Sequence, residues 1–438
     1  MNRVLLVGRG PLPTPDQTTG GFAQLRTRHF LKALTAAGYD VRLLLLHPTG
    51  SPPALPGGDD WSGVFIVEEE GPGWLDQCAV HGRDADVVVS AGPYAPGRAA
   101  VAAAGDAPLW VDVPGDPYAE LEAVSRASPV PLSPARTAAA HAAFAPVLAR
   151  ADALSTVSAP QRLALLGQLG VAGRLHPRPP VHPVPIAFDL PLPRRTPRAR
   201  DASTPLTVAL AGSANPWMDI SGLVEAFRAV QDRRPDTRFI VTGGPVAGLP
   251  APDWSLLSAW AGEHADTVSM LGWIPHGDLP TVLGAAHVGV FADRPAGLEP
   301  ELGDRTRALL YAWLGLDIVA TDRSERMRDL HASGVATAVP AGRPDALAAA
   351  LLALANRDRD VDRSRSLSAH LEAHSAPAEL AAPLLSWVAA PRRVEAVESP
   401  SAILSAERDR LLQELHTMHA SPTWRLLARL HQRVKGSS

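Results

Sequence analysis

A dense group of charged residues lies between two apolar segments in the second half of the chain. Arginine guanidinium groups clamp phosphate oxygens, and carboxylates accept hydrogen bonds from sugar hydroxyls, so such a group suits a ligand that carries both. A solvated loop with internal salt bridges has the same composition, and the residue types alone leave both interpretations open. The group consists of Asp293, Arg294, Glu299, Glu301, Asp304, Arg305 and Arg307.

The segments on either side predict how this group is positioned. Residues 288–292 are apolar and indicate a short strand, Gly315 is placed to end a helix, and residues 317–321 indicate the next strand. The charged loop therefore joins the carboxyl end of a strand to the amino end of a helix, where backbone N–H groups and the helix dipole converge on ligands. The apolar face expected for this helix consists of Leu309, Leu310, Trp313 and Leu314.

Three other predicted strands in this half of the chain each run into a glycine turn. Such turns let a ligand approach the backbone closely at the edge of a parallel sheet. The strands are expected at 206–211, 238–242 and 267–271, and the turns contain Gly212 with Asn215 and Trp217, Gly243 with Gly244, and Gly272 with Trp273 and Ile274.

The first half of the chain opens with the same order of elements. A strand at 3–8, a loop ending in Gly20 and Gly21, and a helix from about 22 to 37 predict a βαβ unit. Its loop has neither the GxGxxG nor the GxxxxGK pattern, so neither dinucleotide binding nor a P-loop is indicated. The two glycines bring backbone N–H groups close to a phosphate or a sugar, or they form a tight turn and nothing more.

Two aspartates follow another predicted strand of the first half, at 109–113. Asp112 and Asp116 lie where this strand ends, so each is a candidate general base or a residue that orients a sugar hydroxyl. Either residue can equally be a loop or turn cap.

Composition limits the classes of function. The chain has 438 residues, enough for two ordinary domains, and a hydrophobic content of 46% supports sizeable cores. A net charge of -4 gives no electrostatic support for nucleic-acid binding, so no nucleic-acid partner is expected. A single cysteine, Cys78, excludes an internal disulfide framework and fits a reducing cytoplasm, where we expect the protein. No run approaches the roughly 20 apolar residues of a membrane helix.

Proline-rich sequence indicates where the domains are joined. Residues 178–200 are too rich in proline for regular structure and predict a last short strand followed by a linker. A helix is expected at 376–388, with a kink at Pro383. The tail from about Ala402 predicts a separate helix interrupted near Pro422. Its last part is amphipathic and basic, which suits the anionic inner face of a cell membrane, a partner helix or the protein's own surface.

With both halves laid out, the sequence resembles the two-domain GT-B glycosyltransferases, and among them the retaining family 4 type. The resemblance covers roughly residues 1–390, and it depends on the order and spacing of several motifs. They are TTGGFAQLRTRHFLKALTAAGYDV (18–41), ALSTVSAPQRLALLGQLG (153–170), LAGSANPWMDISGLVEAF (210–227), FIVTGG (239–244), LGWIPHGDLPTVLGAAHVGV (271–290) and ELGDRTRALLYAWLGLDIVAT (301–321).

The resemblance implies where a nucleotide-diphosphate sugar would bind. It places Gly212 and Asn215 beside the diphosphate and gives Arg305 and Arg307 the task of neutralising the leaving group. It also implies that Glu301 binds sugar or ribose hydroxyls. The residues expected to bind the donor are Gly20, Gly21, Gly212, Asn215, Trp217, Gly243, Gly244, Trp273, Ile274 and Glu301, and those expected to act in catalysis are Asp112, Asp116, Arg305 and Arg307.

The sequence departs from the family pattern at two places. The second glutamate of the usual Glu-x7-Glu motif is replaced by Leu310, and Glu301 fits the first glutamate only with a shift of one residue. The Arg and Lys that usually follow the first strand of the second domain are absent, and the two arginines at 305 and 307 are placed to supply that charge. The alternatives to a transferase are a non-catalytic GT-B homologue acting as a scaffold and a GT-B sugar-nucleotide epimerase.

We therefore expect an α/β protein with two Rossmann-like, doubly wound parallel-sheet domains that face each other across a cleft, plus a C-terminal helical tail. The expected reaction moves a sugar from a nucleotide-diphosphate sugar to a glycan, lipid-linked or other glycoconjugate acceptor, with retention implied by the resemblance. No Asp-x-Asp signature lies at a suitable strand end, so no metal and no other cofactor is expected. The expected divisions are an acceptor domain at 1–190, a linker at 191–204, a sugar-nucleotide domain at 205–362, a helix crossing back at 363–392 and a linker and tail at 393–438.

Overall fold

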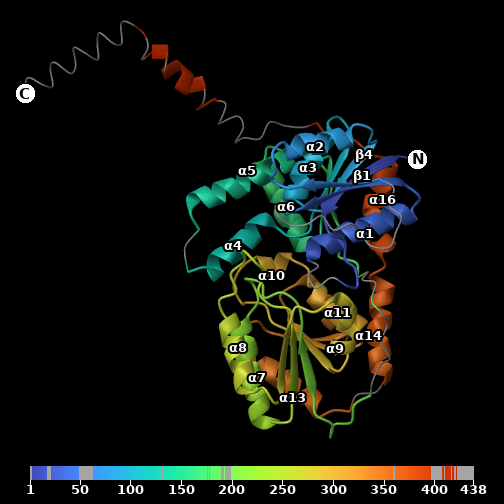
Figure 1. Ribbon diagram of the computed structural model, residues 1–438, viewed down its shortest axis with the longest axis vertical. Coiled ribbons are helices and arrows are strands. Elements are labelled where there is room, and N and C mark those ends of the chain that lie inside the picture. The colour runs from blue at the N-terminus through green and yellow to red at the C-terminus, as the bar shows by residue number, and fades with distance from the viewer. Residues whose placement is uncertain are drawn as a thin grey trace, which may run out of the picture.

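Two α/β domains, each built on a parallel sheet with helices on both faces, make up the protein (Figure 1). The fold predicted from the sequence is confirmed. The computed structural model describes residues 2–16, 21–48, 63–129, 132–174, 176, 178–188, 192, 199–358, 361–395, 407–408, 410–415, 417–418 and 421.

The first domain contains a seven-stranded sheet with the order β3-β2-β1-β4-β5-β6-β7. Its strands are continuous apolar runs because helices cover both faces, as in other parallel sheets. In β1, an interior strand, Val4 pairs with Val41 on one side and with Val87 on the other. The strands are β1 (Arg3–Arg9), β2 (Asp40–His47), β3 (Val64–Glu68), β4 (Val87–Ser90), β5 (Leu109–Val113), β6 (Ala153–Thr156) and β7 (Val181–Pro183). The helices are α1 (Phe22–Ala36), α2 (Trp74–Gly82), α3 (Ala95–Ala104), α4 (Pro117–Ala127), α5 (Pro134–Arg150) and α6 (Ala159–Val171).

The second domain contains a six-stranded sheet with the order β10-β9-β8-β11-β12-β13. The strands are β8 (Thr207–Leu210), β9 (Arg238–Thr242), β10 (Val268–Gly272), β11 (Val288–Phe291), β12 (Asp317–Thr321) and β13 (Ala336–Val339). The helices are α7 (Ile220–Arg233), α8 (Trp254–Glu263), the 3-10 turn η1 (His276–Asp278), α9 (Leu279–Leu283), α10 (Glu299–Leu302), α11 (Thr306–Trp313), α12 (Glu325–Ala332) and α13 (Pro344–Ala355).

Helix α11 buries Leu309 and the following Leu314 as expected, but it also buries Tyr311, which was not expected. Its buried residues include Leu309 and Tyr311, whereas Leu310 and Trp313 are half-buried. The reason is Gly289 on β11, because a Cβ atom at this position would lie 2.2 Å from the Tyr311 ring. The bare backbone of that strand admits the ring, so the tyrosine packs directly against the sheet.

Three helices after the second domain return the chain to the first. They are α14 (Val361–His374), α15 (Pro377–Leu380) and α16 (Ala382–Ala389). Helix α14 packs on the second domain, where Ser364 Oγ donates to the Gly315 carbonyl at 2.8 Å. Helix α16 packs on the first, through Leu384, Trp387 and Val388. The expected single kinked helix is two helices here, because the chain breaks just before Pro383. Within α14, Ser364 is buried, whereas Asp362 and Arg365 are exposed.

A fully buried ion pair of the first domain anchors the segment that connects the two domains. Arg26 on α1 donates to Asp112 through Nε at 2.7 Å and Nη2 at 2.8 Å. The same guanidinium group donates to the carbonyls of Val184 and Pro185, on the connecting segment. At the start of the second domain, Arg200 donates to carbonyls at the end of α13, including that of Leu354. The connection is therefore tied to both domains.

The tail has described residues only as far as 421. Those between 407 and 418 are helical and exposed. The basic amphipathic part expected after Pro422 lies outside the described residues. Among the described residues, none of the helices combines the length and the apolar composition that a bilayer crossing requires.

Replacing Arg26 by alanine leaves the Asp112 carboxylate buried without its cation. We expect this variant to lose about 3–5 kcal/mol of unfolding free energy, the usual cost of breaking a buried pair by removing one partner. Urea denaturation measures the loss. The control is Arg3→Ala, whose pair with Asp86 is exposed and should contribute less than about 1 kcal/mol. Equal losses in both variants would contradict the assignment of Arg26 as a structural anchor.

Candidate functional site

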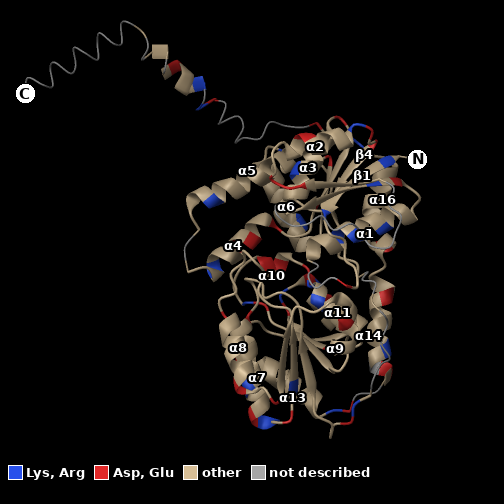
Figure 2. Cartoon of the chain, in the orientation of Figure 1, with Lys and Arg blue, Asp and Glu red and all other residues tan. Residues whose placement is uncertain are grey.

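The carboxyl ends of the second domain's strands face the first domain (Figure 1). The loops that leave these ends, after β8, β9, β10 and β11, carry most of the residues expected to bind a ligand. Acidic and basic residues occur there on and around α10 and α11 (Figure 2). In an open parallel sheet this edge is where ligands bind. It is therefore the candidate site.

Two glycine turns form the floor of the site. The Gly212 N–H donates to the Thr242 carbonyl at 3.1 Å, and the Ala214 N–H donates to the Gly244 carbonyl at 2.9 Å. Gly243 has a φ of 87°, and a Cβ atom there would lie 2.2 Å from the Gly212 oxygen. Only glycine allows this approach, so the turns after β8 and β9 lie directly against each other.

Arg307, on the first turn of α11, reaches these turns. Its Nη2 donates to the Ser213 carbonyl at 2.7 Å, and Nη1 lies 3.2 Å from the Met218 sulfur. A Cβ atom on Gly212 would lie 3.5 Å from Nη2. Among the described residues it forms no ion pair. Burial lowers its pKa, but a guanidinium group stays charged in proteins. The site therefore holds a cation without a carboxylate partner.

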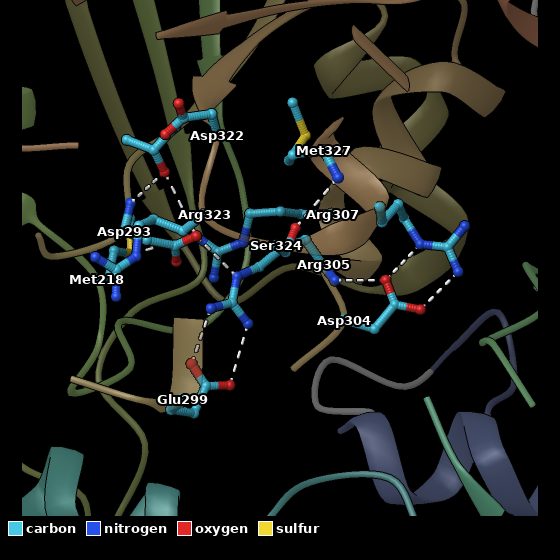
Figure 3. Close-up of polar contacts among 12 residues, drawn as sticks. Met218, Asp293, Glu299, Asp304, Arg305, Arg307, Asp322, Arg323, Ser324 and Met327 are labelled. Carbon is cyan, nitrogen blue, oxygen red and sulfur yellow. Dashed lines mark hydrogen bonds and ion pairs between the residues drawn. The ribbon is translucent and has the colours of Figure 1, made fainter. Parts of the chain in front are cut away.

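Arg305 has a different environment, although it is only two residues away (Figure 3). Its Nε donates to Asp293 at 3.0 Å, while Nη1 and Nη2 donate to the two oxygens of Glu299 at 3.1 and 2.8 Å. Burial disfavours the charged form of the Arg305 guanidinium group, but the carboxylates of Asp293 and Glu299 favour it more strongly and hold its pKa above the usual value. Arg305 is 6% exposed. The expected contact with a leaving phosphate does not fit this geometry, because all three nitrogens already bind carboxylates.

Glu301 lies on the exposed side of α10. Its carboxylate pairs with Arg323 at 3.0 Å and is half exposed. Arg323 also donates to the carbonyls of Pro295 and Gly297, in the loop before α10. The glutamate turned inward is Glu299, which belongs to the charged group but was not among the residues expected to bind the donor.

Trp273 offers an exposed aromatic surface beside the turn after β9. Its side chain is 39% exposed. A Cβ atom on Gly244 would lie 3.7 Å from the Trp273 Nε1 and 3.5 Å from the Trp254 ring, so the glycine leaves room for both indoles. Ile274 is half-buried next to it. Asn215 and Trp217 belong to the loop after β8 that also contains Gly212.

The two aspartates of the first domain are structural groups. Asp112 is fully buried in its pair with Arg26 and also accepts from Ser155 Oγ at 2.5 Å. Asp116 is the N-cap of α4 and accepts from the backbone of Tyr118 and Ala119. Both therefore fit the capping and packing interpretation rather than that of a general base, which must reach the substrate.

Of the glycine pair before α1, the structure describes one member. Gly21 is the exposed N-cap residue of that helix, with extended backbone angles. Gly20 lies outside the described residues. Pro15, earlier in the same loop, accepts from the Gly277 N–H of the second domain at 2.7 Å, so the loop does approach the other domain.

A pair of residues that were not predicted as site residues, Tyr94 and Glu120, lies on the first domain opposite α10. The Tyr94 hydroxyl donates to Glu120, and Glu299 and Asp116 are close enough to act on the same charge. Burial raises the pKa of Glu120 to about 7, and the nearby carboxylates add to the effect. No motif identifies Tyr94 and Glu120 in the sequence, because they come from separate elements. Tyr94 lies in the turn before α3, Glu120 lies on α4, and the nearby Glu299 lies on α10.

The two domains contact each other directly along α10. Ser158 Oγ, at the start of α6, donates to the Leu302 carbonyl at 2.7 Å, and the Leu298 N–H donates to Glu122 at 3.0 Å. Asp304 accepts from the Ile186 N–H at 3.3 Å, on the segment that joins the domains. Arg326 donates both to Asp304 and to the Ile186 carbonyl. The loop of the candidate site thus carries interdomain contacts.

Comparison with protein families gives a match in the second domain. Residues 205–357 match the family model described as Glycosyl transferases group 1. No curated protein matches the chain in sequence.

Several solved structures share the fold over both domains. The Anabaena protein HepE, in complex with UDP and glucose, has 13% sequence identity and a TM-score of 0.60 over 89% of this chain and 100% of that chain. Sucrose-phosphate synthase from Thermosynechococcus elongatus has 16% identity and a TM-score of 0.63 over 89% of this chain and 98% of that chain. AviGT4, a glycosyltransferase involved in avilamycin A biosynthesis, has 16% identity and a TM-score of 0.51 over 90% and 100%. The likeness shows that the two domains have the GT-B arrangement.

Removal of Arg305 leaves two carboxylates together in a buried place. We expect Arg305→Ala to lose about 3–5 kcal/mol of unfolding free energy. The double variant Arg305→Ala/Glu299→Gln should be more stable than the single one, because it buries one uncompensated charge fewer. Urea denaturation of both variants, with exposed Arg343→Ala as the control, measures this. A double variant less stable than Arg305→Ala would contradict the network.

Glu120 should make stability depend on pH. Its folded pKa of about 7 lies above the ordinary glutamate value of 4.5, so the folded state holds this proton more tightly than the unfolded state. Stability should therefore fall as the pH rises from about 4.5 to 7 and then level off. Glu120→Gln cannot titrate, so its free energy of unfolding lacks this pH dependence. The difference in unfolding free energy between the wild type and the variant should therefore change progressively between about pH 4.5 and 7.

Urea denaturation at pH 5, 6, 7 and 8 measures the difference. Glu122→Gln is the matched control, because the Leu298 N–H and Arg126 lower the pKa of Glu122 against the effect of burial. A constant difference between wild type and Glu120→Gln at all four pH values would contradict the assignment.

Proposed function

We propose that the protein is a glycosyltransferase that moves a sugar from a nucleotide-diphosphate sugar to a glycan, lipid-linked or other glycoconjugate acceptor. The match of residues 205–357 to Glycosyl transferases group 1 supports the reaction class. The GT-B arrangement of the domains supports a donor held mainly by the second domain. The acceptor then binds on the first.

The observation that carries the proposal is the position of Arg307. Its guanidinium group lies against the turn at Gly212 and Ser213, at the carboxyl end of the central strand β8. An arginine beside a glycine turn at this edge is suited to a phosphate group, since guanidinium donors match phosphate oxygens and the glycine keeps the approach open. Arg305 does not compete for this task. In the proposal it positions the loop that precedes α11.

The charge of Arg307 suits the transition state of such a transfer. Cleavage of the glycosyl–diphosphate bond leaves negative charge on the phosphate and positive charge on the sugar ring. A fixed cation near the phosphate stabilises that charge without reorganisation during the reaction. Since Arg307 supplies this charge, we propose a reaction that needs no metal ion. Retention of anomeric configuration is proposed from the resemblance to the retaining family 4 type.

The base of the donor is assigned to the neighbourhood of Trp273. The exposed indole follows β10 and lies beside the Gly244 turn, and in the sheet β10 is on the side of β9 away from β8, whose turn Arg307 contacts. Stacking of a nucleobase on an aromatic side chain contributes about 1–3 kcal/mol in nucleic-acid complexes, and the same contact is available here. Because HepE is in complex with UDP, uracil is the first base to test.

The acceptor is assigned to the surface around Tyr94 and Glu120. Both face α10, which carries Glu299. With a pKa of about 7, Glu120 exists in both protonation states near neutrality, so it can accept from or donate to an acceptor hydroxyl. A lipid-linked acceptor would bring the protein to the inner face of the cell membrane.

Binding of nucleoside diphosphates tests the proposal. Isothermal titration with UDP, GDP, ADP and TDP should show clear preference for one base. Arg307→Ala should weaken that binding about 10- to 100-fold, which corresponds to the loss of one charged hydrogen-bonding group at a phosphate. Addition of EDTA should leave the affinity unchanged.

The control variant is Arg343→Ala, since this exposed arginine pairs with Asp345 away from the glycine turns. Indifference of the wild type to all four nucleotides would favour a non-catalytic scaffold. Tight binding with conversion of the donor sugar, in the absence of any acceptor, would favour an epimerase.

A further inference from the structure

A short helix in the tail has an apolar face that packs on none of the residues that the structure describes. The described residues between 407 and 418 are helical, and Leu411, Leu412, Leu415 and Met418 are 46–50% exposed. Arg410 pairs with Glu407 and Glu414, which satisfies the charged side of the helix within itself. In Figure 1 this helix lies apart from both domains. Exposed apolar residues at helical spacing indicate a surface that packs on something.

Helix α6 of the first domain has a matching apolar face. Leu163 and Val171 are 67% and 72% exposed, among the most exposed large apolar side chains of the described chain. Gly167 lies midway between them, and a Cβ atom at that position would meet nothing within 4 Å. The three residues follow one another at intervals of four, so they form a single ridge along the helix. A glycine in the middle of such a ridge allows a second helix to approach closely.

The tail begins next to the end of α6. The Val394 N–H donates to Asp152 at 2.8 Å, which holds the start of the tail beside the first residues after α5. Arg174, three residues beyond α6, donates to the Leu148 carbonyl of α5 at 3.1 Å. The carboxyl end of α6 and the start of the tail therefore meet at the end of α5.

The remaining chain is long enough to reach the ridge. The residues between 395 and 407 can span up to about 40 Å when extended. The part of α6 from Leu163 to Val171 is about 12 Å long. The tail helix can therefore lie along the whole of this part, in either direction.

The length of the tail helix and the area it can bury favour a contact within one chain over a contact between two chains. A helix of about 12 residues is marginal alone, and its apolar face buries far less than the roughly 1,200 Å² of a stable bimolecular interface. A tether raises the effective concentration to the millimolar range, so a weak contact is populated only within one chain. A second copy would not have this advantage.

We propose that the tail helix docks its Leu411, Leu415 and Met418 face on the Leu163–Gly167–Val171 ridge of α6 in the same chain. The tail then covers the helix whose N-cap residue, Ser158, contacts Leu302 of α10. This proposal is independent of the proposed function, because no residue of the glycine turns or of the Arg305 network takes part.

Limited trypsin digestion of the full chain tests the docking. Arg408 and Arg410 lie on the tail helix, so cleavage after them reports how often the helix is undocked. We expect Leu163→Glu/Val171→Glu to accelerate this cleavage about tenfold, because burial of the two apolar side chains is lost. The tail variant Leu411→Glu/Leu415→Glu should accelerate it by the same factor. The two pairs of substitutions combined should add little, since each removes the same contact.

Val80→Glu is the matched control, because Val80 is an exposed valine on a different helix of the same domain and should not affect cleavage. The digestion is repeated over a hundredfold range of protein concentration and with vesicles containing anionic lipid. Cleavage that slows at higher concentration would identify a second copy as the partner and overturn the proposal. Equal cleavage in all variants, or protection that needs vesicles, would overturn it as well.

Discussion

A single guanidinium group, that of Arg305, joins three parts of the loop between β11 and α11. It binds Asp293 where the strand ends, Glu299 on α10, and it directly precedes α11. Taking ions out of water costs several kcal/mol each, so they remain buried only if their geometry is closely satisfied. Gly303 makes this possible, because a Cβ atom there would lie 2.5 Å from a Glu299 oxygen. The course of the loop is therefore determined by the need to keep three charges paired.

The position of Arg307 follows from this loop and from the packing below it. Tyr311, one helical turn later, fills the space over Gly289 and accepts from the Ala211 N–H at 2.9 Å. Ala211 is the residue before Gly212, so the tyrosine connects α11 with the turn that Arg307 contacts. The network fixes the beginning of the helix and the tyrosine fixes its middle. Between them the Arg307 side chain is directed to the turn rather than to the carboxylates.

The sequence predicted the strands and the candidate edge because apolar runs and glycine turns are local signals. It did not predict which charged residues of the loop pair with each other. Arg305 and Arg307 are only two residues apart in the sequence, but Arg305 is buried between two carboxylates, whereas Arg307 contacts a backbone carbonyl. Glu299 and Glu301 are likewise distinguished by the direction of α10, which depends on its contacts with the first domain. Tyr311 went unnoticed because its burial depends on a glycine 22 residues earlier. Gly20 and residues 422–438 lie outside the described residues.

The charged loop also reaches the segment that joins the domains. Asp304 is adjacent to Arg305, yet it faces the opposite way, toward Arg326 and the Ile186 backbone. Successive residues thus serve two networks, one within the candidate site and one at the connection between domains. Because Asp304 accepts from Arg326 of the second domain and from Ile186 of the connecting segment, a change in the relative position of the domains acts on the residue next to Arg305. The charges that looked like a ligand-binding group in the sequence therefore mainly hold the loop and the domains in place, and this leaves Arg307 as the cation directed to the turn.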